Sequence, residues 1–298
     1  MSKIMYKQTR FRSDSLALIE KVNQIVTEYH LQGYELTLRQ VYYQLVAGGI
    51  IENKERSYKN LGTLISNARL AGLIDWNAIV DRTRYLRGFN HDVSPGGAIE
   101  GLSQTYRTNS WAGQENYVEV WVEKDALIDI VGQASNKFDV RFFSCRGYVS
   151  QSAMFRAAQR FEHMYSHGKD VTILHLGDHD PSGIDMSRDI EERLNTFEVF
   201  PLVKRIALNM DQIEEYNPVP NPTKLTDSRA GDYIKQFGYE SWELDALQPQ
   251  VIDDLITSYI EPLIDHDVMN SVKAKCDEDK RLMESVSYNW DQIAEDYA

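Results

Sequence analysis

Two aspartates directly follow an apolar segment of the chain, at the start of a Pro-Ser-Gly turn. They are Asp178 and Asp180, in VTILHLGDHDPSGIDM, residues 171–186. Two ionised carboxylates held this close repel each other, which raises the pKa of one of them unless a cation intervenes. A third acidic residue, Glu123, ends the apolar segment YVEVWVE. An all-oxygen set without a neighbouring Cys or His cluster suits Mg²⁺ or Mn²⁺, with phosphates completing the coordination shell. We therefore expect Glu123, Asp178 and Asp180 to bind metal; the alternative is a solvated acidic loop.

A tyrosine pair provides a second candidate for chemistry, in the segment TLRQVYYQLVAGG. Thr37 and Gln40 have the spacing of a capping box, which predicts a helix after Thr37. Tyr42 falls on the apolar face of that helix and should pack in the core. Tyr43 is rotated from it by about 100°, so we expect an exposed hydroxyl beside Arg39, its i,i+4 neighbour. A guanidinium there would stabilise phenolate and phosphate charge alike, although both tyrosines filling a helical bundle is the alternative.

The elements around Glu123 and Asp178 read as an α/β sheet with a substantial parallel part. The segments YVEVWVE, VRFFSC, VTILHLGD and VKRIALN have the composition of strands, and a helical stretch follows each. Ligands of such sheets bind beyond the carboxyl ends of the strands. Glu123 and Asp178 should therefore share one edge, with Lys124 and Arg146 beside it as candidate phosphate contacts.

Residues 1–90 predict three short helices followed by a basic hairpin, the order of a winged helix-turn-helix. The third helix, with Lys59 and Asn60 on its outer face, would enter the major groove of DNA, and Arg82 and Arg84 of the hairpin would contact phosphates. A three-helix bundle without DNA is the alternative. This part holds 13 Lys/Arg against 8 Asp/Glu, although the whole chain has a net charge of −13. A locally basic surface can still attract phosphates.

The composition of the remaining segments indicates where the regions of the chain begin and end and which type of protein to expect. Residues 91–116 are rich in Gly, Ser and Asn and read as a linker, 117–230 as the α/β domain, and 231–298 as an acidic helical region with 16 Asp/Glu against 5 Lys/Arg. The N-terminus lacks the apolar core of a signal peptide, and no apolar run approaches the ~18 residues of a membrane span. With only two cysteines, we expect a cytoplasmic protein without a disulfide framework or zinc site.

Three motifs together carry a resemblance to a known family. VEVWVEKDAL, SCRGYVSQSAMFR and LGDHDPSGIDM are similar in order and spacing to the Toprim domain of type IIB topoisomerase A subunits. That family includes the archaeal topoisomerase VI A subunit and the related meiotic double-strand-break protein. The likeness covers roughly residues 117–210, and LRQVYYQ resembles the Arg-x-x-Tyr-Tyr signature of the family's winged-helix domain.

The resemblance implies a metal-dependent, topoisomerase-like enzyme that cleaves double-stranded DNA. Tyr43 would be the nucleophile, with Arg39 and Glu123 also catalytic, and Glu123, Asp178 and Asp180 would hold Mg²⁺ or Mn²⁺. We expect a homodimer, because cutting both strands of a duplex requires two nucleophiles, and the resemblance implies that each tyrosine acts with the metal of the other protomer. No G-x-x-x-x-G-K-[ST] loop is present, so an ATPase would be a separate subunit. A hydrolytic Toprim nuclease and a non-catalytic DNA-binding protein with this fold remain alternatives.

Overall fold

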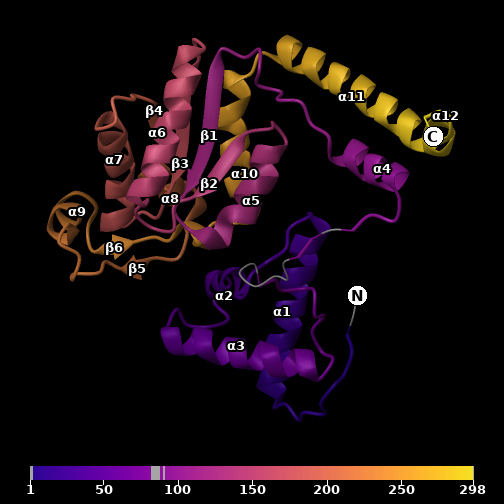
Figure 1. Ribbon diagram of the computed structural model, residues 1–298. Coiled ribbons are helices and arrows are strands. Elements are labelled where there is room, and N and C mark those ends of the chain that lie inside the picture. The colour runs from indigo at the N-terminus through magenta and orange to yellow at the C-terminus, as the bar shows by residue number, and fades with distance from the viewer. Residues whose placement is uncertain (1–2, 82–87, 90, 298) are drawn as a thin grey trace.

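A four-stranded parallel sheet forms the centre of the computed structural model, which describes residues 3–81, 88–89 and 91–297 (Figure 1). The strand order is β2-β1-β3-β4, so β1 and β3 lie in the middle. The strands are β1 (Asn116–Val122), β2 (Arg141–Ser144), β3 (Asp170–Leu176) and β4 (Leu202–Ala207). All four were predicted from the apolar segments, and the mixed α/β class with a parallel sheet is confirmed.

Helices cover both faces of this sheet. On one face, α5 (Ile128–Asn136) and α10 (Pro249–Ile260) pack against the strands, and on the other lie α6 (Gln151–Ser166) and α7 (Pro181–Asn195). Because both faces are buried, the central strands read as nearly continuous apolar runs. Between β4 and α10 lie α8 (Met210–Tyr216), α9 (Ala230–Phe237), the short ribbon of β5 (Asn221–Pro222) and β6 (Glu240–Ser241), and the 3-10 helix η2 (Leu244–Ala246).

Helix α10 corrects the expectation that residues 231–298 form a separate acidic appendage. Ile252, Ile256 and Ile260 are fully buried and belong to the same core cluster as the strands β1 and β3. Their i, i+4 spacing puts them on one face of α10, and the neighbouring Asp253 is also buried, paired with Lys137. The α/β core therefore extends well past residue 230.

The N-terminal part contains the three predicted helices, α1 (Ser13–Leu31), α2 (Leu38–Ala47) and α3 (Glu55–Leu70). The predicted capping box at the start of α2 is present, and Gly33, at φ +85°, follows the end of α1. The winged-helix assignment is not confirmed. Residues 73–81 contain no strand and make only a single parallel bridge, Leu36 to Ile79. The predicted hairpin arginines, Arg82 and Arg84, lie outside the described residues.

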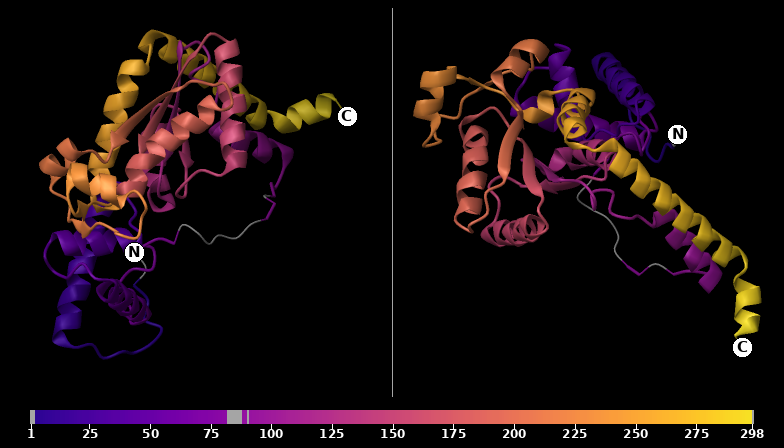
Figure 2. Two further views of the ribbon diagram at one scale, coloured as in Figure 1. Left: turned by 90° about the vertical axis from the view of Figure 1, so that its left-hand side faces the viewer. Right: turned by 90° about the horizontal axis from the view of Figure 1, so that it is seen from above.

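The predicted linker, 91–116, contains a helix, α4 (Pro95–Thr105), which packs along α11 (His266–Tyr288). The two helices project together from the rest of the molecule, and α12 (Trp290–Asp296) follows at the end (Figure 2). Ser94 caps α4, and a side chain at Gly96 would approach Trp290 to within 3.1 Å. The glycines that suggested a linker thus permit close helix packing. No helix in the described ranges is both long and apolar enough to cross a membrane.

Candidate active site

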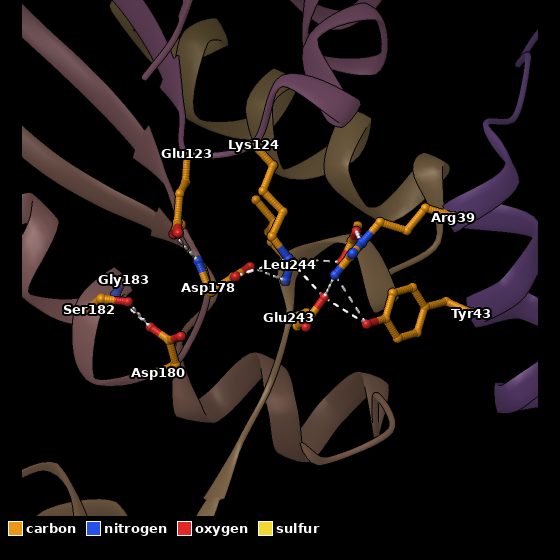
Figure 3. Close-up of polar contacts among 12 residues, drawn as sticks. Arg39, Tyr43, Glu123, Lys124, Asp178, Asp180, Ser182, Gly183, Glu243 and Leu244 are labelled. Atoms are coloured by element: carbon orange, nitrogen blue, oxygen red, sulfur yellow. Dashed lines mark hydrogen bonds and ion pairs between the residues drawn. The ribbon is translucent and has the colours of Figure 1, made fainter. Parts of the chain in front are cut away.

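The predicted acidic residues lie at the carboxyl edge of the sheet, where β1 and β3 end. Glu123 directly follows β1, and its Oε2 accepts a hydrogen bond of 2.8 Å from the backbone N–H of Asp178. The carboxylate of Asp178 turns to the other side (Figure 3). There its Oδ1 accepts from the N–H of Leu244 at 2.8 Å, and its Oδ2 lies 2.9 Å from Lys124 Nζ. Both oxygens of Asp178 are therefore engaged.

Asp180 begins helix α7 and explains the Pro-Ser-Gly turn. Its Oδ1 accepts hydrogen bonds from Ser182 Oγ at 2.9 Å and from the N–H of Gly183 at 2.7 Å, so it is the N-cap. Pro181 occupies the first helical position, where its missing N–H costs nothing. A β-carbon at Gly183 would lie 2.2 Å from the carbonyl oxygen of Asp178. Glycine is therefore required where the helix folds back against the loop.

Arg205, on β4, binds the backbone of this loop. Its role was not predicted from the sequence. Its guanidinium donates hydrogen bonds to the carbonyl oxygens of Gly177, Asp178 and Gly183, at 2.9, 2.6 and 2.8 Å. Burial lowers the pKa of Arg205 to about 10, which still leaves it charged at neutral pH. A positive charge thus lies beneath the acidic residues and partly offsets their repulsion.

Tyr43 and Arg39 of α2 meet a second acidic pair, Glu243 and Asp245, which follows β6. Tyr43 Oη donates to Glu243 Oε2 at 2.7 Å, and Arg39 Nε donates to Asp245 Oδ2 at 2.6 Å. Arg39 Nη2 also pairs with Glu243 and lies 3.4 Å from Tyr43 Oη. The predicted i,i+4 pairing of Arg39 with Tyr43 is therefore confirmed.

Lys124 joins this cluster to the edge of the sheet. Its Nζ lies 3.0 Å from Glu243, 3.1 Å from Asp245 and 2.9 Å from Asp178 (Figure 3). Burial alone would lower its pKa, but the three carboxylates outweigh that effect and raise it. The network therefore runs unbroken from Tyr43 through Glu243 and Lys124 to Asp178.

The expectation that Tyr43 is exposed is wrong. Only 5% of Tyr43 is accessible, about as little as the 4% of its core neighbour Tyr42. Burial, followed by the hydrogen bond to Glu243, raises the pKa of Tyr43, although Arg39 opposes the shift. The residues that cover the hydroxyl are 200 positions downstream, so the periodicity of α2 could not reveal them.

The electrostatics of the edge carboxylates suit a cation. Burial raises the pKa of Glu123, and Asp180 raises it further. Burial also raises the pKa of Asp178 to about 7, more than the ion pair with Lys124 lowers it. No group of three or more His, Cys, Asp or Glu side chains in the described chain is spaced to hold a metal ion. Glu123 and Asp180 each engage only one oxygen in the hydrogen bonds above, and Mg²⁺ is commonly held by one or two carboxylates together with phosphates. Glu123 and Asp180 are therefore the residues that would hold the ion.

The predicted DNA-binding residues are dispersed over the molecule. Asn60 lines a groove of 660 Å³ between α3 and residues 9–18, whereas Lys59 is exposed and pairs with Glu55 along the same helix. Arg146 follows β2 by two residues and pairs with Asp125 at 3.1 Å. Of the basic residues proposed for phosphate contact, Lys124 alone among the described ones joins the network of Tyr43.

Glu243 and Asp245 are the functional candidates that the sequence reasoning missed. The segment SWELDAL does carry a signal, because two acidic residues flank a leucine within an otherwise apolar stretch. Leu244 is fully buried, which places Glu243 and Asp245 together on the side facing α2. Comparison of the chain with protein-family models, curated proteins and solved structures gave no match.

Proposed function

We propose that this protein cleaves double-stranded DNA by transesterification, with Tyr43 as the nucleophile and Mg²⁺ as the cofactor. One observation carries the proposal: a tyrosine hydroxyl, two cationic side chains and one carboxylate of the parallel-sheet edge, that of Asp178, form a single network. Tyr43 Oη and Lys124 Nζ contact the same oxygen of Glu243, and Lys124 contacts Asp178. A nucleophile and cations are parts that phosphoryl transfer to a tyrosine requires, and Glu123 and Asp180, which would hold the metal, flank Asp178 at the same edge.

Each side chain has a distinct part in this reaction. Tyr43 Oη attacks phosphorus, so that an O–P bond to tyrosine forms while the bond to one deoxyribose oxygen breaks. The tyrosine proton passes to water, and the departing oxygen takes a proton from water. Arg39 and Lys124 stabilise the negative charge that develops on the phosphate oxygens. Glu123 and Asp180 would hold Mg²⁺, which supplies Lewis-acid stabilisation of the same charge. Asp178 positions Lys124.

Cleavage of both DNA strands needs two nucleophiles, and we propose a homodimer as their source. A twofold-symmetric pair would present one Tyr43 to each strand. Tyr43 contacts Glu243 of its own chain, and we propose that each site is built from a single protomer, with a site shared between protomers as the alternative. With no phosphate-binding ATPase motif in the sequence, any ATP-driven step would belong to a separate subunit.

A hydrolytic nuclease is the second candidate function, and the burial of Tyr43 favours it. A tyrosine that is 5% accessible and whose pKa is raised is held protonated. In this alternative, water attacks the phosphate, and Tyr43 only holds Glu243 in place.

Trapping of the reaction with detergent distinguishes the two functions. The wild type and the Tyr43→Phe and Asp180→Asn variants are incubated with supercoiled plasmid and Mg²⁺, then denatured and separated with and without protease. Transesterification predicts protein covalently attached to DNA ends, abolished by either substitution. A nuclease predicts free ends that persist in Tyr43→Phe. Intact plasmid with every protein would contradict both functions and leave DNA binding alone.

A further inference from the structure

Three hydrogen-bond donors converge on a single oxygen of Glu243. Its Oε2 accepts from Tyr43 Oη at 2.7 Å, from Lys124 Nζ at 3.0 Å and from Arg39 Nη2. A phenol, an ammonium and a guanidinium around one anionic oxygen are the surroundings that a phosphate oxygen would need. In the proposed reaction, the same three side chains contact the phosphate of the DNA.

Glu243 and Asp245 hold the same cations but differ in accessibility. The side chain of Asp245 is fully buried, whereas 24% of the Glu243 side chain is exposed. Asp245 keeps Arg39 at 2.6 Å and Lys124 at 3.1 Å without help from Glu243. Withdrawal of Glu243 would therefore leave the two cations in place, each with an N–H group free to donate a hydrogen bond to a ligand.

A cavity gives access to this position. Its volume is 260 Å³, and it is lined by Arg39, Tyr43 and Glu243, together with Asn53 and Lys54 just before α3, Glu55 at the start of α3 and Asn221 from β5. Lys54 is largely exposed and pairs only with Glu52 in the described structure, and Glu55 pairs with Lys59. The cavity therefore adds one cation, one carboxylate with its own cationic partner and two amides on the approach to Glu243.

We propose that Arg39, Tyr43 and Lys124 form a phosphodiester-binding site in which the Glu243 carboxylate takes the place of a phosphate oxygen. DNA must then displace Glu243 before its phosphate reaches Tyr43. The inference rests on the proposed function for the identity of the ligand. It adds that the free protein is self-inhibited, because its own carboxylate competes with the substrate for the same three donors.

Binding of a fluorescent DNA duplex in EDTA, without metal and hence without cleavage, tests this competition. Glu243→Gln removes the charge and keeps the shape, and we expect it to bind the duplex about tenfold more tightly than the wild type. The dependence of duplex affinity on salt concentration should become steeper, by an amount equal to up to about two additional phosphate contacts, since Arg39 and Lys124 become available. Combining Glu243→Gln with Lys124→Gln should remove most of the gain.

Glu240→Gln is the matched control, because it removes the same charge three positions away at an exposed site of β6. The proposal is overturned if Glu243→Gln binds no more tightly than the wild type, or if Glu240→Gln gives an equal gain. Thermal unfolding checks that each variant is folded. Should Glu243→Gln fail to fold, Glu243→Asp, which retracts the carboxylate by one methylene, should give a smaller gain, and no gain would equally overturn the proposal.

The result of this binding experiment can be distinguished from the result of the covalent-trapping experiment that tests the proposed function. A wild type that forms the covalent adduct while Glu243→Gln shows no gain in affinity would refute the competition and leave transesterification standing. A gain in affinity without any adduct would support the phosphate site and refute the chemistry.

Discussion

Tyr43 and Glu243 lie 200 positions apart in the sequence, and a hydrogen bond of 2.7 Å joins their side chains. This contact belongs to a largely polar interface between the N-terminal helices and the sheet domain. Tyr34 Oη donates to Gln250 at 3.0 Å, and Asn53 donates to Asn221 at 2.7 Å. Polar interfaces of this kind are typical of domains that move relative to each other. The proposed displacement of Glu243 by DNA would act on contacts of this polar kind.

The ionisation of Glu243 should make stability depend on pH in acid. Burial opposes ionisation, but Lys124, Tyr43 and Arg39 lower the pKa of Glu243 from 4.5 to about 2. A carboxyl whose pKa is lowered by folding contributes stability above its ordinary pKa and loses it as the pH falls toward the folded value. We expect the difference in unfolding free energy between the wild type and Glu243→Gln to shrink by up to roughly 3 kcal/mol between pH 4.5 and 2. Urea unfolding at several pH values measures it, and a difference independent of pH would contradict the prediction.

Gly183→Ala should disrupt the acidic loop. The added methyl would lie 2.2 Å from the carbonyl oxygen of Asp178, so the backbone must shift at a cost of at least about 2 kcal/mol. DNA cleavage should fall as the bond between Asp178 N and Glu123 is displaced. Gly231→Ala is the control, since a β-carbon there meets nothing within 4 Å and alanine stabilises a helix by about 0.5–1 kcal/mol. Equal melting temperatures for the two variants would show that the loop tolerates the shift.

Metal binding should depend on Glu123 and Asp180. We expect Mg²⁺ or Mn²⁺ to raise the melting temperature of the wild type, and Glu123→Gln or Asp180→Asn to abolish that increase. Asparagine is also a good N-cap, so Asp180→Asn should leave α7 intact. Asp185→Asn serves as the control: it lowers the starting stability by removing partners of Tyr148 and Arg229 but should keep the metal-dependent increase. Absence of any response of the wild type to millimolar metal, with or without DNA, would count against the site.

The groove beside α3 should contact the DNA backbone. It is lined by Arg10 and Arg12 on one side and by Asn60 and Asn67 of α3 on the other. Replacing either arginine with alanine should weaken duplex binding and reduce the salt slope by about one phosphate contact. Lys235→Ala, at an exposed position of α9 that pairs with Asp232, should leave the slope unchanged. Unaltered slopes in both arginine variants would place the DNA elsewhere.

Local patterns of the sequence predicted the parts of the fold that depend on near neighbours. The capping box of Thr37 and Gln40 and the apolar strands that end before Glu123 and Asp178 are examples, and all are present. Local patterns do not predict contacts between residues that are far apart in the sequence. The segment SWELDAL carries a weak local signal, but only the return of the chain after β6 to α2 brings Glu243 and Asp245 to Tyr43 and Arg39. Helix α4 was missed because its stability comes from packing on α11, which lies far along the chain.

Mixed dimers test whether Tyr43 works with the carboxylates of its own chain. The hydrogen bond to Glu243 and the link through Lys124 to Asp178 lie within one protomer. A dimer of Tyr43→Phe with Asp180→Asn then contains no complete site, so we expect neither nicks nor double-strand breaks. Wild type mixed with Tyr43→Phe keeps one complete site per mixed dimer and should nick plasmid DNA. Sedimentation on DNA verifies that dimers form.

A shared site gives the opposite result for the double-mutant mixture. Tyr43 from the Asp180→Asn chain would then meet the intact carboxylates of the Tyr43→Phe chain, which restores one site and produces nicks. Such nicks would show that Tyr43 leaves Glu243 of its own chain and reaches across the dimer. The within-chain contacts would then belong to the resting protein alone, and the tyrosine would have to move between protomers before each cleavage.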